Sequence, residues 1–107
     1  MTGLGSLEEV RIENNHLTDL DLTGLTSLRA LSCYGNQLHT LDARPAAVLE
    51  VLQADSNGME SLLVEGLGNL KTLHCQNNNL QQISLSGLGA LEEFNAANNS
   101  LTETDRG

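Results

Sequence analysis

A leucine recurs at a fixed interval of 21 residues along this chain of 107 residues. The copies begin at Leu7, Leu28, Leu49, Leu70 and Leu91, and no insertion interrupts the spacing. The apolar skeleton of the first copy runs through Leu7, Val10, Ile12, Leu17, Leu20, Leu22 and Leu25, and the later copies repeat it. A fixed period of this kind is typical of architectures in which similar units stack on one another. We therefore expect one repeat domain over residues 1–107, with the fifth copy truncated.

Each copy opens with a segment of the form Leu-x-x-Leu-x-Leu, whose alternation has the two-residue period of a short strand. Copies 21 residues apart would then stack as a parallel sheet. A parallel pair needs a crossover of roughly a dozen or more residues, and the rest of each copy supplies it. We expect that crossover to be a turn and a short extended or irregular return, because no long helix fits.

The composition supports an aliphatic core, since 39% of the residues are hydrophobic but the chain has one Tyr, one Phe and no Trp. The formal charge of −9 argues against nucleic acid as a partner, because such partners need many Lys and Arg residues. No stretch approaches the ~18 apolar residues of a membrane span, so we expect no membrane insertion.

One polar residue type occupies the same position in all five copies, at Asn15, Asn36, Asn57, Asn78 and Asn99. A turn that enters the core leaves backbone groups unpaired, and an Asn amide can both donate to and accept from neighbouring coils. We predict a structural asparagine ladder. Gly24, Gly66 and Gly87 also share one position, where we expect a tight bend with positive φ.

The skeleton Leu-x-x-Leu-x-(Leu/Cys/Ala)-x-x-Asn-x-Leu resembles the leucine-rich repeat. The 21-residue period and the sequence Leu-Asp-Leu-Thr-Gly-Leu at residues 20–25 are similar to bacterial, internalin-like members. Cys33 and Cys75 match a partial cysteine ladder, whereas Ile12, Ala54 and Ala96 fill its other rungs. The resemblance implies an α/β-type solenoid, a right-handed coil with its parallel sheet on the concave face. It also suggests a surface or secreted protein.

The two cysteines lie two copies apart, so a strand spacing of ~4.8 Å separates them by about 10 Å, beyond disulfide reach. We expect buried free thiols and no metal site or cofactor. The histidines His16, His39 and His74 occupy three different repeat positions and are expected to face solvent.

The outward positions of the sheet form the surface on which we expect a partner to bind, because a solenoid holds them on rigid strands. Residues next to the inward rungs form two columns, and the predicted partner-binding residues are Arg11, Ser32, Gln53 and His74 in one and Glu13, Tyr34, Asp55 and Gln76 in the other. This polar face could bind a protein or, less favourably, a glycan. A further column, Glu8, Arg29, Glu50, Lys71 and Glu92, alternates in charge, which we interpret as control of strand register.

No catalytic motif is present, so we do not expect an enzyme. The leading hypothesis is a recognition module that binds a protein on its concave face. The alternative is a structural or assembly subunit of a larger surface or viral particle, self-associating or held through open solenoid ends. This alternative rests on the ends of the repeat array, because Thr104 and Arg106 replace the apolar residues that Leu20 and Leu22 provide in the first copy.

Overall fold

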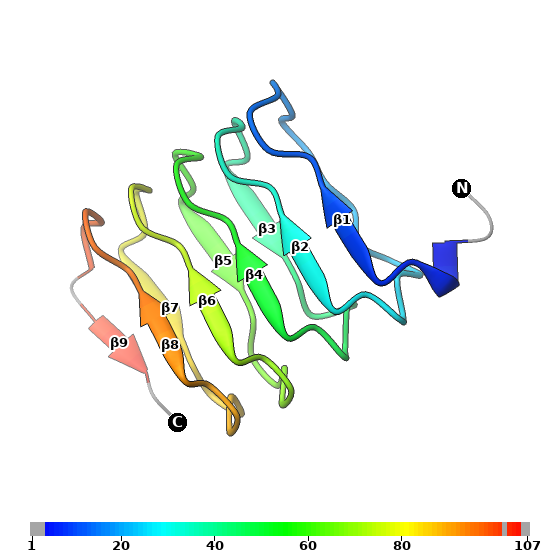
Figure 1. Cartoon of the computed structure of the whole chain (residues 1–107). Helices are drawn as coiled ribbons and strands as arrows, with labels where there is room; N and C mark the ends of the chain where they lie inside the picture. Colours follow the sequence, from blue (N-terminus) through cyan, green and yellow to red (C-terminus); the bar gives the residue numbers. More distant parts are fainter. Residues whose placement is uncertain (1–3, 102, 106–107) are drawn as a thin grey trace.

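The computed structural model describes residues 4–101 and 103–105. The chain forms a stack of coils, and each coil adds one strand to a five-stranded parallel sheet in the order β1-β2-β4-β6-β8 (Figure 1). These strands are β1 (Glu9–Arg11), β2 (Ala30–Ser32), β4 (Val51–Gln53), β6 (Thr72–His74) and β8 (Glu93–Asn95). The predicted parallel sheet is therefore confirmed.

A second wall lies behind this sheet and is formed by the returns of the coils (Figure 1). Its strands pair in parallel as two short sheets, β3 with β5 and β7 with β9. They are β3 (Thr40–Asp42), β5 (Ser61–Leu63), β7 (Gln82–Ser84) and β9 (Glu103–Asp105). Within the described ranges the one helical segment is the 3-10 turn η1 (Leu4–Ser6). The returns are thus short and extended, as the sequence predicts.

The register of the five-stranded sheet follows the repeat period without a slip. Val10 lies opposite Leu31, Leu31 opposite Leu52, and Leu73 opposite Phe94. Each pair is one period apart, so side chains at the same repeat position become neighbours across strands. A slip of one residue would turn every core side chain toward solvent, which is why the alternation fixes the register.

An aliphatic core fills the space between the two walls. The central residues of the inner sheet strands, such as Leu52 and Leu73, are completely buried, and Leu41 and Leu62 face them from the return wall. Each fully buried leucine contributes about 1.5–3 kcal/mol relative to an exposed one. Because each coil is too small to enclose a core alone, this burial depends on the coils above and below.

The asparagine column joins each coil to the one before it. The side chain of Asn78 accepts hydrogen bonds from the N–H groups of Asn57 and Met59, both at 2.9 Å. Its amide nitrogen donates to the carbonyls of Ala54 at 3.1 Å and Cys75 at 2.9 Å. Asn36 makes the same four kinds of contact two copies earlier.

The tight bends on the return wall have the predicted backbone, with φ of 88° at Gly24, 81° at Gly66 and 79° at Gly87. A Cβ at Gly24 or Gly66 would meet no atom within 4 Å, but one at Gly87 would lie 3.0 Å from the Cα of Gly66, tighter than an ordinary contact. Glycine is required there by both the φ angle and the contact.

Cys33 and Cys75 are buried in the core, as predicted, and both are free. Burial raises the pKa of each thiol to about 12, with a smaller contribution from the charge of Asp55. Both side chains therefore behave as small apolar residues and not as reactive thiolates.

The ladder generates a first prediction, on Asn57. The substitution Asn57→Leu removes the acceptor of the Leu38 N–H and the donor to the carbonyls of Cys33 and Ala54. Each buried group left unpaired costs about 1–3 kcal/mol, so the free energy of unfolding in a denaturant titration should fall by about 3 kcal/mol or more.

Asn15→Leu is the matched control, because Asn15 is exposed and its side chain donates only to its own turn, at Ile12 and Glu13. We expect that variant to lose less than about 1 kcal/mol. Equal losses for the two variants would contradict a ladder that links coils.

The thiols generate a second prediction. Their folded pKa of about 12 lies above the value of ~8.5 expected in the unfolded chain, so the unfolded state loses its thiol protons first as pH rises. This contribution to stability is complete below about pH 8 and is lost between about pH 8.5 and 12. The free energy of unfolding should therefore fall more steeply over that range in the wild type than in a Cys33→Ala, Cys75→Ala double variant. Parallel pH curves would show that the thiols are not held protonated by the fold.

Candidate functional site

The solvent side of the five-stranded sheet carries three rows of side chains, which together we call the sheet face. Two rows contain all the residues that the sequence predicts for partner binding. The first row is Arg11, Ser32, Gln53, His74 and Asn95, and the second is Glu13, Tyr34, Asp55, Gln76 and Ala97. The third row was not predicted, and it comprises Glu9, Ala30, Val51, Thr72 and Glu93. The signal for it was present, since the residue before an inward strand centre points outward just as the residue after it does.

Tyr34 lies in its row between Glu13 and Asp55, and the backbone holds that order. The N–H of Asn14 donates to the carbonyl of Tyr34 at 2.9 Å, and the N–H of Gly35 donates to the carbonyl of Asp55 at 3.2 Å. The ladder of backbone hydrogen bonds therefore continues beyond the strands. Adjacent coils are held at about strand spacing, ~4.8 Å, at this row.

The residues after this row end the strands with a left-handed backbone in every coil. Asn14, Ser56, Asn77 and Asn98 have φ between 58° and 59°, and Gly35 has φ of 76°. Asparagine and glycine accept this conformation more readily than other residues, which accounts for the amide-rich strand exits in the sequence. A Cβ at Gly35 would come within 2.3 Å of Asn14 Oδ1, but that exposed side chain can move aside, so the positive φ is the stronger reason for glycine beside Tyr34.

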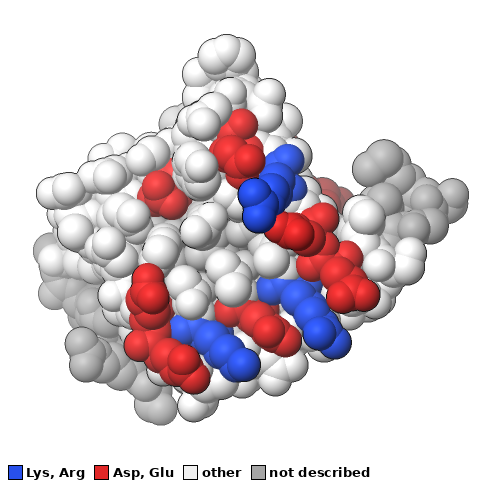
Figure 2. Space-filling model, in the orientation of Figure 1, with Lys and Arg blue, Asp and Glu red and all other residues white. Residues whose placement is uncertain are grey.

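Charged side chains gather at both ends of the sheet face, and Asp55 is the one charged residue of its three rows between them (Figure 2). On β1 the Arg11 guanidinium donates to Glu9 at 2.6 Å, and the pKa of Arg11 is raised mainly by this hydrogen bond and charge, with smaller contributions from Glu13 and Tyr34. At the other end the His74 ring donates from Nε2 to Glu93 on the next strand. No described residue forms an ion pair within 4 Å with Glu13 or Asp55.

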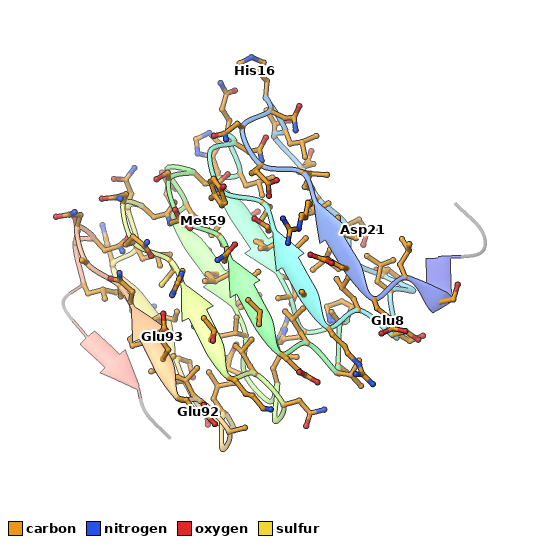
Figure 3. The ribbon with its side chains drawn as sticks, in the orientation of Figure 1. Glu8, His16, Asp21, Met59, Glu92 and Glu93 are labelled. Atoms are coloured by element: carbon orange, nitrogen blue, oxygen red, sulfur yellow. The ribbon has the colours of Figure 1, made fainter. Side chains whose placement is uncertain are left out.

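The alternating column of Glu8, Arg29, Glu50, Lys71 and Glu92 runs along one edge of the sheet face. Figure 2 shows the alternation of acidic and basic side chains along that edge, and Figure 3 labels Glu8 at one end of the sheet and Glu92 at the other. No salt bridge within 4 Å joins its described members. Exposed pairs of this kind contribute at most about 1 kcal/mol, so the column affects register only weakly.

Two buried polar atoms on the sheet face have no hydrogen-bond partner in the described part of the protein, Ser32 Oγ and Gln76 Oε1. Ser32 lines a shallow depression of about 370 Å³ whose floor includes Ala30, Leu31 and Val51. A buried polar atom without a partner costs about 1–3 kcal/mol, and a bound molecule recovers that cost when the side chain turns outward to pair with it.

The histidines lie apart from one another. His16 is exposed at the tip of the first turn (Figure 3), and His39 is exposed just before β3. His74 is half-buried on the sheet face. Among the described residues no three His, Cys, Asp or Glu side chains gather closely enough to hold a metal ion. The same residues contain no helix with the length and apolar character of a membrane span.

A family model described as "Leucine Rich Repeat" matches residues 69–91 of the chain. This segment is the fourth copy, and the in-register stack extends its pattern through the other copies. The chain is a leucine-rich repeat protein. No curated protein and no solved structure gives a significant match. The internalin-like subtype stays a prediction, since the matched model describes the family as a whole.

Leucine-rich repeat domains generally mediate protein binding and are typically non-catalytic. In this leucine-rich repeat protein the sheet face combines three features suited to such binding: a rigid backbone, one large aromatic side chain at Tyr34, and polar atoms without partners at Ser32 and Gln76. The described return wall has no aromatic side chain, because Tyr34 and Phe94 are the chain's only two.

Proposed function

We propose that this leucine-rich repeat protein is a non-catalytic recognition module that binds a protein partner on its sheet face. The observation that carries the proposal is the position of Ser32 Oγ and Gln76 Oε1. Both are buried and unpaired, and both belong to this one face. Stability alone favours satisfied polar atoms, so a surface that keeps two unsatisfied ones is suited to a ligand that completes them.

The partner's contribution follows from the chemistry of the face. Ser32 can donate or accept a hydrogen bond and the Gln76 carbonyl oxygen accepts one, so a peptide backbone or a polar side chain suits both. The depression beside Ser32 is lined by Ala30 and Val51, which suit a small apolar group. A protein surface offers both kinds of group together, whereas a glycan lacks the apolar side chain.

Tyr34 is expected to contribute most to binding, since interface energy concentrates in Tyr, Trp and Arg anchors. The substitution Tyr34→Ala should weaken partner binding by about 2 kcal/mol or more, which is about thirty-fold, and leave the melting temperature nearly unchanged. The measurement is capture of a protein partner by the immobilised chain, followed by titration of the purified partner against wild type and variant.

Leu63→Ala is the matched control for that substitution, because Leu63 is also a half-buried large side chain but lies on β5 in the opposite wall. The control should retain full affinity. A partner that binds wild type and Tyr34→Ala equally well, or that is lost only with Leu63→Ala, would remove the sheet face as its site.

A second candidate function is assembly through the ends of the stack, and the burial pattern favours it. Leu7 is 39% exposed, whereas Leu28 and Leu49, at the same position in later copies, are completely buried. At the other end Leu91 and Phe94 are only half-buried. An open sheet end of this kind can accept another chain.

Light scattering of the purified chain distinguishes the two functions. A mass that stays monomeric over a wide concentration range supports the recognition module alone, since exposed ends would then attract no second copy. A mass that rises with concentration, and returns to the monomer in a Leu7→Ser variant, would support assembly through the ends.

A further inference from the structure

From the row that contains Tyr34 we propose that the sheet face binds an arginine side chain of its partner, stacked on the Tyr34 ring between the carboxylates of Glu13 and Asp55. The inference rests on the proposed function and names the chemistry that the partner must present. The structure fixes the order of these three residues, because backbone hydrogen bonds join their coils on both sides of Tyr34. We call them the Tyr34 cradle.

The two carboxylates of the cradle are available to an incoming cation. Neither Glu13 nor Asp55 forms a salt bridge with a described residue. Arg11 is the nearest cation in the neighbouring row, but its guanidinium is already paired with Glu9 at 2.6 Å. The four charged groups Glu9, Arg11, Glu13 and Asp55 therefore sum to two negative charges beside one aromatic ring.

Guanidinium fits this arrangement better than the other cations of proteins. It is planar and stacks on an aromatic face, and its donors point outward in the plane, where carboxylates on either side can accept them. The coils beside Tyr34 are each ~4.8 Å away, so a group seated over the ring comes within side-chain reach of both carboxylates.

The polar atoms around the cradle support a protein ligand over a free cation. Ser32 Oγ and Gln76 Oε1 lie in coils on the sheet face within one repeat of the cradle, and both lack partners within the described structure. An arginine that belongs to a polypeptide brings backbone amides and carbonyls to these atoms at the same time. A small free cation would leave them unpaired.

The chain carries its own reporter for this test, since Tyr34 is its one Tyr and it has no Trp. The probe is a blocked tetra-arginine peptide titrated at low ionic strength, with Tyr34 fluorescence as the signal. The control peptide replaces each arginine by citrulline, which keeps the shape and removes the charge. We expect saturable quenching by the arginine peptide and none by the citrulline peptide at the same concentrations.

Two double variants test whether the cradle or the overall charge binds the peptide. Glu13→Gln with Asp55→Asn should weaken binding about five-fold, as expected for the loss of two exposed ion pairs. Glu60→Gln with Glu65→Gln makes the same change in net charge on the opposite wall, where both residues line one groove. That control should change affinity less than about two-fold, since screening limits charges at such distance.

Three outcomes would each contradict the assignment of an arginine to the cradle. They are equal weakening by the two double variants, equal binding of the citrulline peptide, and an absence of saturable quenching. These outcomes are separate from a failure of the proposed function. If they occur while Tyr34→Ala still abolishes capture of a partner, the sheet face remains the site and the arginine assignment is wrong. If capture also survives Tyr34→Ala, the sheet face itself is not the site.

Discussion

Every other feature of this fold depends on how the buried turns of the coils satisfy their backbone hydrogen bonds. Each coil consists of three-residue strands joined by turns and extended segments, which cannot pair these backbone groups within one coil. The asparagine column solves this, because the amide of Asn78 accepts from two N–H groups of the preceding coil and donates to carbonyls of both coils. Stacking thus provides hydrogen bonding and core burial together, and a coil removed from the stack loses both.

This dependence makes the sheet face a direct consequence of the sequence period. Since the register is fixed at one period, the neighbours of any exposed side chain are the residues 21 positions before and after it. Residues at one repeat position therefore form a row across the face. A ligand on that row meets side chains from three coils whose backbones are held at nearly fixed separations. Glu13, Tyr34 and Asp55 are separated in the chain but become immediate neighbours, with no loop whose conformation must be ordered on binding.

The sequence allowed the fold to be predicted further than the site, and the reason is physical. The positions of Leu31, Leu52 and Leu73 are dictated by burial, so a period and an alternation suffice to infer the sheet, its direction and its register. The division of the return wall into β3 with β5 and β7 with β9 depends on small differences between returns, and no pattern in the sequence indicates it. The pairing of Arg11 with Glu9 within its own strand, and not along a column, likewise depends on side-chain rotamers.

The site also depends on what is left unpaired, which a sequence does not display. Ser32 and Gln76 were predicted as members of the face, but their lack of partners follows from the neighbours that the register brings beside them. In the row of Ser32 the adjacent side chain of Arg11 is held by Glu9, and His74 two coils away is held by Glu93. Arg11 and His74 thus pair with acidic residues near their own ends of the face, whereas Ser32 Oγ in the coil of Tyr34 and Gln76 Oε1 two coils away keep no partner. A surface that leaves polar atoms and carboxylates without partners around its one large aromatic side chain offers groups that a ligand can pair.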